Sequence, residues 1–167
     1  DAVQQILTKH ESRAGLHLRL VDPTADPIIS VATDDSEIAN ADLIIEAVTE
    51  NYAIKSAILS RIEPHLRSGA IIASNSSSLS LTQFSRSLQQ PGRFCGLHFC
   101  HPVSERLLVE VVYTDTTTSD TRNRAKAFAT SLGMAPIVVR DSPGFLLNRL
   151  LVPYLNEALE LLLDGAD

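Results

Sequence analysis

Apolar and polar residues alternate along the chain in blocks whose period changes between that of a helix and that of a strand. Helical spacing predicts helices at residues 1–13, 35–41, 51–66, 81–89 and 119–133. Alternating or continuous apolar runs predict strands at residues 16–21, 28–33, 42–48, 70–74, 94–100, 107–113 and 135–141. Ser142 and Pro143 then predict the start of a last helix, with the serine as N-cap and the proline at the first helical position.

Strands that alternate with helices predict an α/β fold, a doubly wound sheet with crossover connections. Ligands of such sheets bind at the carboxyl ends of the strands, so the polar residues that directly follow each apolar run are the candidates for a site. These residues are Asp22, Glu50 with Asn51, the segment from Asn75 to Ser78, and Asp141 with Ser142.

The apolar pattern also predicts which faces are buried. The run DLIIEAV at residues 42–48 is typical of a strand covered on both faces. In the helix at 51–66, Ile54, Ile58 and Ile62 form one stripe. The last apolar segment contains Asn156, Glu157 and Glu160, which favours an amphipathic helix over a membrane span.

Composition narrows the functional classes. With 167 residues, of which 44% are hydrophobic and 20% charged, the chain can bury the core of one ordinary domain. Its formal net charge of −6, with scattered Lys and Arg, argues against a nucleic-acid surface. Cys95 and Cys100 share one predicted strand, where a disulfide between them is sterically poor, so we expect reduced, buried thiols in a cytoplasmic protein.

A dinucleotide site is suggested by one acidic residue. No G-x-G-x-x-G occurs in the chain, but Gly15, an alternating strand and Asp22 follow the first helix in the order expected after a glycine loop. We therefore expect the first strand and the glycine loop to precede Asp1, and the chain to be a fragment of a longer protein. The alternative is that Asp22 and Pro23 merely form a turn.

A histidine and a glutamate occupy two neighbouring predicted strands. If residues 94–100 and 107–113 pair antiparallel about a symmetric turn centred on Ser104, His98 lies directly opposite Glu110 on the same face. A carboxylate that accepts from one ring nitrogen fixes the tautomer and leaves the other nitrogen as a base near neutral pH. His101 faces Leu107 in this register and has no acidic partner.

Two other interpretations of this pair stay open. It can be a structural His–Glu contact in the core, or both residues can lie on an exposed face of the sheet. A metal site is the weakest interpretation, because His98, Cys100 and His101 lack a spacing typical of zinc and no second ligand pair occurs.

Five segments in this order resemble the 3-hydroxyacyl-CoA dehydrogenases over roughly residues 40–165. They are ADLIIEAVTEN (41–51), IIASNSSSLS (71–80), GLHFCHPV (96–103), LVEVV (108–112) and DSPGFLLNRLLVPYLNEA (141–158). The resemblance implies a Rossmann-type NAD-binding domain at residues 1–141. It also implies that residues 142–167 are the first helix of an all-helical C-terminal domain, which carries much of a homodimer interface.

The resemblance also implies roles for individual residues. His98 matches the catalytic base, Glu110 its orienting carboxylate, and Ser77 and Asn148 the groups that hydrogen-bond the substrate oxygens. The expected cofactor is NAD, and no metal is implied. The positions implied as cofactor contacts are Asp22, Ala47, Glu50, Lys55, Asn75, Ser77 and His101. Ser77 as a helix cap and Asn148 as a partner of local backbone groups remain the alternatives.

The implied reaction is NAD-dependent oxidation of the 3-hydroxyl of a 3-hydroxyacyl-CoA in fatty acid metabolism. Two departures bear on the substrate: His101 stands where the family usually has asparagine, and the helical arm that grips CoA is absent after Asp22. The second departure resembles relatives that act on acyl-carrier-protein thioesters, such as a glyceryl thioester, in polyketide biosynthesis. A catalytically silent binding module and the lens-crystallin use of this fold are the alternatives to an enzyme.

Overall fold

The computed structural model describes residues 34–103 and 105–165. The helix predicted at 1–13, the strands predicted at 16–21 and 28–33, and Asp22 lie outside the described residues. The described residues form one five-stranded sheet in the order β1-β2-β3-β4-β5. Its strands are β1 (Leu43–Glu46), β2 (Ile71–Ser74), β3 (Phe94–Phe99), β4 (Leu108–Tyr113) and β5 (Ala135–Arg140).

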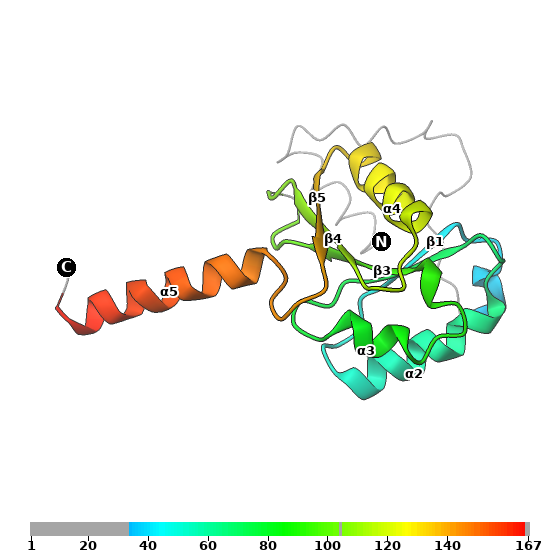
Figure 1. The fold of residues 1–167 in the computed structure, drawn as a ribbon, viewed down its shortest axis with the longest axis horizontal. Helices are drawn as coiled ribbons and strands as arrows, with labels where there is room; N and C mark the ends of the chain where they lie inside the picture. The colour runs from blue at the N-terminus through cyan, green and yellow to red at the C-terminus, as the bar shows by residue number, and fades with distance from the viewer. Residues whose placement is uncertain (1–33, 104, 166–167) are drawn as a thin grey trace, which may run out of the picture.

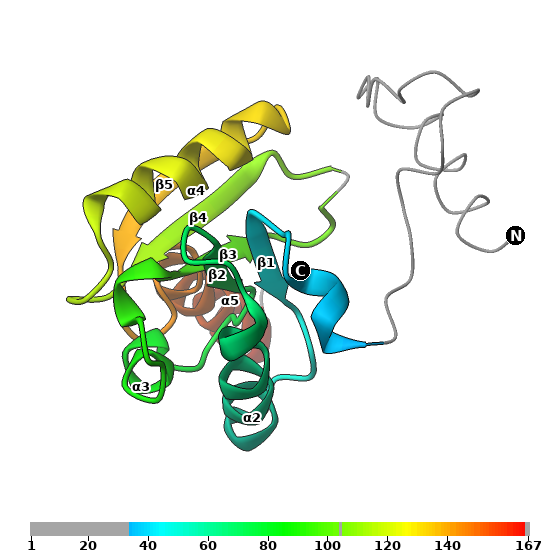
Figure 2. The ribbon, with the colours of Figure 1, turned by 90° about the vertical axis from the view of Figure 1, so that its right-hand side faces the viewer.

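Helices cover both faces of this sheet. The α-helices are α2 (Tyr52–Ile62), α3 (Leu81–Ser85), α4 (Ser119–Ser131) and α5 (Leu147–Leu163), and the 3-10 helices are η1 (Asp35–Ile38), η2 (Glu63–His65) and η3 (Pro91–Arg93). Figures 1 and 2 show α4 on one face and α2 with α3 on the other. The predicted α/β fold, a doubly wound sheet with helices on both faces, is therefore confirmed for the described residues.

The two faces of the sheet bury separate apolar clusters, because successive side chains of a strand point to opposite sides. On the side of α2 and α3 the cluster includes Leu59, Ile72, Leu81, Phe84 and Phe94. On the side of α4 it includes Ile71, Ala73, Cys95, Leu97 and Ala125. The sheet is thus a buried central layer, and a polar group inside it needs a partner.

The predicted register between the third and fourth strands is confirmed. β1, β2 and β3 run parallel, whereas β3 and β4 are antiparallel and pair His98 with Glu110 and Phe99 with Val109. β4 and β5 are parallel again. The antiparallel pair is joined by the short segment after Phe99, which lets two residues twelve positions apart meet on one face.

Two burial predictions are wrong in part. Ile45 of β1 is 36% exposed, because α4 packs over β3, β4 and β5 and leaves that face of β1 open in the described part of the chain. The buried face of α2 is also turned by about one residue. It contains Lys55, Leu59 and Ile62, while Ile54 is exposed, because the Lys55 side chain points inward to an acidic partner.

Helix α3 is shorter than predicted. It ends at Ser85 rather than near residue 89. The Glu63 carboxylate accepts hydrogen bonds from the backbone amides of Gln89 and Gln90, at 2.7 Å and 2.8 Å. These bonds hold the chain in a loop that turns toward η3, where it cannot continue the helix.

The start of the last helix is also corrected. Ser142 is not its N-cap; α5 begins at Leu147, after the residues Pro143 to Leu146. Gly144 and Phe145 have φ angles of +73° and +49°, in the left-handed region that no right-handed helix contains. No residue of α5 is buried, and Figure 1 shows this helix projecting away from the sheet.

No helix among the described residues combines the length and the apolarity that crossing a bilayer requires. Cys95 and Cys100 are both buried and unbridged, as predicted.

Candidate active site

A buried histidine–carboxylate pair lies near the carboxyl end of β3. His98 Nδ1 is 2.7 Å from Glu110 Oε2, and the two residues are 5% and 1% exposed. An ionised carboxylate can only accept, so Nδ1 carries the proton and donates it to Glu110. In the neutral ring Nε2 is then unprotonated, which is the state a general base requires.

The second oxygen of Glu110 binds the start of α5. Glu110 Oε1 accepts hydrogen bonds from the amides of Leu146 and Leu147, at 2.8 Å and 2.9 Å. The carboxylate of a strand residue thus replaces the side-chain cap that Ser142 was expected to provide. A negative charge at this position is favourable because the amides at a helix N-terminus have no partner inside the helix.

These contacts keep Glu110 ionised. Burial raises the pKa of the Glu110 carboxyl, but the hydrogen bond from His98 and the amides of Leu147 and Leu146 outweigh it and lower the pKa below its ordinary value. An ionised Glu110 would stabilise the imidazolium that forms when His98 takes up a second proton.

Ser77 and Asn148 are brought together from distant parts of the sequence. Asn148 Nδ2 donates to the backbone carbonyl of Ser77 at 3.2 Å. Asn148 therefore does not serve a local backbone group. Ser77 does not cap α3 either, because that helix begins at Leu81 and its Thr82 amide donates to Asp141 at 2.8 Å.

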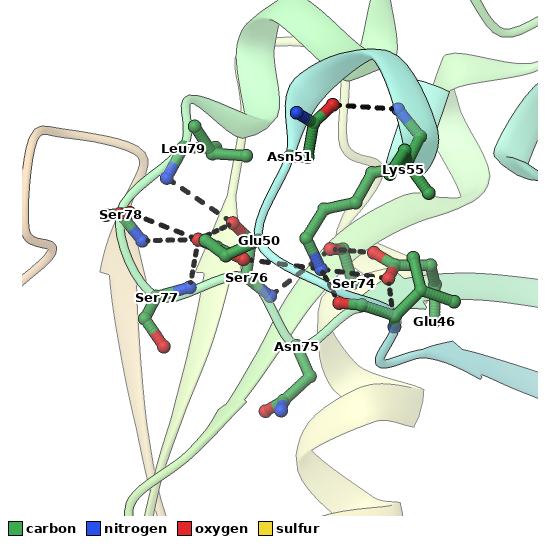
Figure 3. A network of polar contacts seen from close by, with 12 residues as sticks. Glu46, Glu50, Asn51, Lys55, Ser74, Asn75, Ser76, Ser77, Ser78 and Leu79 are labelled. Carbon is green, nitrogen blue, oxygen red and sulfur yellow. Dashed lines mark hydrogen bonds and ion pairs between the residues drawn. The ribbon is translucent and has the colours of Figure 1, made fainter. Parts of the chain in front are cut away.

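The backbone of the serine segment is held by one carboxylate. Glu50 Oε1 accepts from the amides of Ser77 and Ser78, at 2.9 Å and 3.0 Å, and from the hydroxyl of Ser76 at 2.6 Å. Figure 3 shows these three serines around the Glu50 carboxylate, with the Ser77 hydroxyl pointing away from it. The segment is therefore fixed while the Ser77 hydroxyl is directed elsewhere.

The pKa of Glu50 reflects this setting. Burial raises the pKa, but the Ser76 hydroxyl, the amides of Ser78 and Ser77 and the Lys55 ammonium together lower it to about 2. Glu50 is thus an anion at neutral pH, with its side chain 36% exposed.

Lys55 is buried among oxygen atoms. Its Nζ lies 2.9 Å from Glu46 Oε1, 3.0 Å from the Val48 carbonyl and 3.3 Å from Glu50 Oε2. These three acceptors match the three protons of an ammonium group. With 1% of its surface exposed, Lys55 acts on the site mainly through Glu50.

The other residues predicted to contact the cofactor differ in where they lie and in how exposed they are. Asn75 lies after β2 and its Oδ1 accepts from the Phe99 amide at 2.9 Å, which ties the ends of β2 and β3 together. Ala47 is exposed just beyond β1, and His101 is exposed beyond β3. Asp22 lies outside the described residues.

The sequence interpretation missed Glu46 and Phe145. Glu46 Oε2 accepts from the Ser74 hydroxyl at 2.6 Å, so the Glu46–Lys55 pair joins β1, α2 and β2. The same signal that indicated Glu110, a carboxylate in an apolar strand, also marks Glu46 in DLIIEAV. Phe145 packs edge-on against His98, with ring centroids 5.5 Å apart, and no sequence pattern predicts that contact.

In the described part of the chain, no group of three or more His, Cys, Asp or Glu side chains is arranged to hold a metal ion. The side chains instead suit polar organic groups: they are an imidazole, a serine hydroxyl, an asparagine amide and a partly exposed carboxylate.

The chain is similar to proteins of known class. A family model described as the NAD binding domain of 3-hydroxyacyl-CoA dehydrogenase matches residues 2–142. The alpha subunit of a fatty acid oxidation complex from Idiomarina loihiensis is 42% identical over 130 residues, which are 78% of this chain and 18% of that protein.

The chain is also similar to solved structures of dehydrogenases and reductases. The (S)-3-hydroxybutyryl-CoA dehydrogenase from Ralstonia eutropha is 40% identical with a TM-score of 0.77, over 80% of this chain and 47% of that one. A diketoreductase is 32% identical with a TM-score of 0.82, over all of this chain and 62% of that one. The chain thus spans less than two thirds of each of these relatives.

The family match covers the whole sheet and the buried dyad, and the two solved structures named above adopt the same fold at 40% and 32% identity. The chain therefore belongs to the NAD-binding domain family of the 3-hydroxyacyl-CoA dehydrogenases, which are NAD-dependent oxidoreductases with a Rossmann-type fold.

Proposed function

We propose that the protein oxidises the 3-hydroxyl of a 3-hydroxyacyl thioester to the 3-oxo form with NAD as the hydride acceptor. The observation that carries this proposal is the buried His98–Glu110 pair, whose hydrogen bond of 2.7 Å leaves Nε2 of His98 as a base. The family match supplies the reaction class.

The geometry supports a role for each of four residues. His98 Nε2 takes the proton of the 3-hydroxyl, and Glu110 holds the ring in the required tautomer and stabilises the imidazolium. The Ser77 hydroxyl and the Asn148 amide hold the substrate oxygens, because the bond between Asn148 and the Ser77 carbonyl brings these two residues together. Most of the rate enhancement then comes from orientation and acid–base catalysis.

The cofactor would lie along the carboxyl ends of β1 and β2. Glu50 presents a partly exposed carboxylate that can accept from ribose hydroxyls, and the small, exposed Ala47 leaves space beside it. Asn75, Ser77 and His101 would face the nicotinamide side and Asp22 the adenosine ribose, while Lys55 holds Glu50. When bound, NAD accepts the hydride that leaves C3 of the substrate.

The carrier of the acyl group is part of the proposal. CoA is favoured because the relatives named above include a 3-hydroxybutyryl-CoA dehydrogenase at 40% identity. An acyl-carrier-protein thioester is the second candidate, because the sequence lacks, after Asp22, the helical arm with which the family grips CoA. Turnover of a matched pair, 3-hydroxybutyryl-CoA and the same acyl group on an acyl carrier protein, distinguishes the two carriers.

The proposal extends to the assembly. We infer that residues 142–167 begin a helical domain and that α5 contacts a second copy of the protein, because its exposed side chains include Leu150, Tyr154, Leu159 and Leu163. The buried, unbridged cysteines support a cytoplasmic location. Sedimentation of the full-length protein and of Leu159→Glu tests the assembly: the variant should sediment as a smaller species.

A catalytically silent binding module is the competing function. Two measurements on the full-length protein distinguish the dehydrogenase from the silent module: calorimetry with NAD, and NADH formation from 3-hydroxybutyryl-CoA. The dehydrogenase proposal expects saturable NAD binding and NADH formation. NAD binding without NADH formation from any 3-hydroxyacyl thioester would favour the silent module instead.

A further inference from the structure

The segment between β5 and α5, residues 142–146, is here called the elbow; in Figure 1 it is the orange turn that connects the two elements. Its backbone is strained. Phe145 has a φ of +49°, and Gly144 before it has a φ of +73°. A bulky residue in the left-handed region is costly and persists only where its surroundings hold it. Phe145 is indeed 3% exposed, inside the cluster beneath α2 and α3.

The elbow and the first residue of α5 contact both members of the buried dyad. The Phe145 ring lies edge-on to the His98 imidazole, with centroids 5.5 Å apart and an interplanar angle of 62°. The amides of Leu146 and Leu147 donate to Glu110 Oε1, at 2.8 Å and 2.9 Å. The left-handed turn at Gly144 and Phe145 is what places the ring and the two amides together on the dyad.

The elbow is fastened on both sides: its N-terminal side is bonded to α3, and its C-terminal side to the serine segment between β2 and α3. On its N-terminal side, Asp141 Oδ2 accepts from the Thr82 amide at 2.8 Å and from the Thr82 hydroxyl at 2.6 Å. On its C-terminal side, Asn148 donates to the Ser77 carbonyl. The elbow therefore cannot move without disturbing the serine segment or the dyad.

We propose that the elbow positions the catalytic base: Gly144 and Phe145 are positioning residues that set the orientation of His98 and couple it to α5. Through the two amides, a rotation of α5 turns the Glu110 carboxylate, and Glu110 in turn holds His98. This inference rests on the proposed role of His98 as the base.

Gly144→Ala tests the proposal, and Gly165→Ala is its matched control. Both glycines have positive φ angles, +73° and +89°, so alanine strains both positions. A Cβ at Gly144 would meet no atom closer than 3.4 Å and one at Gly165 none within 4 Å, so neither substitution creates a clash. The two glycines differ mainly in place: Gly144 adjoins the dyad, and Gly165 follows the far end of α5.

For Gly144→Ala in the full-length protein, we expect kcat to fall at least about tenfold, because a small displacement of a base costs rate steeply. The KM for NAD should stay near that of the wild type. The proton on His98 Nδ1, observed by NMR of labelled histidine, should lose its hydrogen-bonded resonance. Gly165→Ala should match the wild type in all three measurements.

Phe145→Leu is the second variant, which keeps an apolar side chain in the cluster but removes the ring edge against His98. It should lower kcat and perturb the His98 resonance while circular dichroism remains that of the folded protein. Equal effects of Gly144→Ala and Gly165→Ala, or an unchanged His98 resonance in both Gly144→Ala and Phe145→Leu, would overturn the proposal. Turnover of His98→Gln tests the proposed function. The His98 resonance is measured without substrate, so it tests the positioning role separately, whatever the turnover of His98→Gln turns out to be.

Discussion

Glu110 shows how one buried side chain can serve both the fold and the site. Its Oε2 receives the His98 proton and its Oε1 receives the two amides that begin α5. Each oxygen is satisfied, which is the condition under which a charge can be buried in a sheet. The same arrangement leaves the second nitrogen of His98 for its proposed role as a base.

Glu50 leads to a prediction about how the free energy of unfolding depends on pH. Its pKa is about 2 in the folded protein and 4.5 ordinarily, so its charged form favours folding. That contribution is fully present above about pH 4.5 and is lost as the pH falls toward 2. The difference in free energy of unfolding between wild type and Glu50→Gln should therefore shrink over this window in urea titrations. A difference that does not change with pH contradicts this account.

The residue-scale interpretation succeeded where a local pattern carries the information. A symmetric turn assumed from the sequence predicted the pairing of His98 with Glu110, and the register between β3 and β4 confirms that pairing. The elbow could not be predicted in this way. A φ of +49° at Phe145 follows from the tertiary contacts that trap its ring, whereas the serine and proline before it have the sequence of an ordinary helix start.

At the scale of elements, the inward-pointing Lys55 explains why α2 buries a different face than its isoleucines predict. The ammonium joins Glu46 on β1 to Glu50 on the loop after it, and Ser74 on β2 completes the set. Apolar periodicity does not register a buried ion pair, so the helix was predicted with a rotated face. Its predicted end near Leu66 was also too late, because α2 ends at Ile62 and the 3-10 helix η2 follows. The early end of α3 was also missed because of a buried carboxylate: Glu63 accepts hydrogen bonds from the loop that follows the helix.

The buried ion pair between Lys55 and Glu46 leads to a prediction about stability. Lys55→Met leaves the Glu46 carboxylate buried without its cation, so the free energy of unfolding should fall by about 3–5 kcal/mol. Arg140→Met is the control, because Arg140 and its partner Asp115 are both largely exposed and such pairs contribute at most about 1 kcal/mol. Urea unfolding measures both. Equal losses for the two variants would show that the Lys55 pair is no better than a surface contact.

Packing between α3 and β3 makes a second prediction. A Cβ at Gly96 would lie 2.5 Å from Leu81 Cδ1 and 2.9 Å from Val112 Cβ, whereas one at Gly69 would meet nothing within 4 Å. Gly96→Ala should therefore destabilise the protein by about 1–3 kcal/mol, while Gly69→Ala should have little effect. Unfolding curves that coincide for the two alanine variants would contradict the packing described for β3.

At the scale of the whole molecule, the sheet and the projecting α5 meet at the dyad. A sheet with helices on both faces follows from the alternation of strands and helices in the sequence, whereas the order of the strands is seen only in the structure. How α5 attaches does not follow from that alternation either, because it depends on a carboxylate from β4 and a carbonyl from the serine segment. The molecule thus joins its sheet to its last helix through the groups proposed to perform the chemistry.

The most direct test of the central claim is turnover and NAD affinity measured together on His98→Gln in the full-length protein. Because His98 is the proposed base, NADH formation from 3-hydroxybutyryl-CoA should fall at least about a hundredfold. The dissociation constant for NAD from calorimetry should stay that of the wild type, since no cofactor contact is assigned to His98. NADH formation in His98→Gln at close to the wild-type rate would contradict the account.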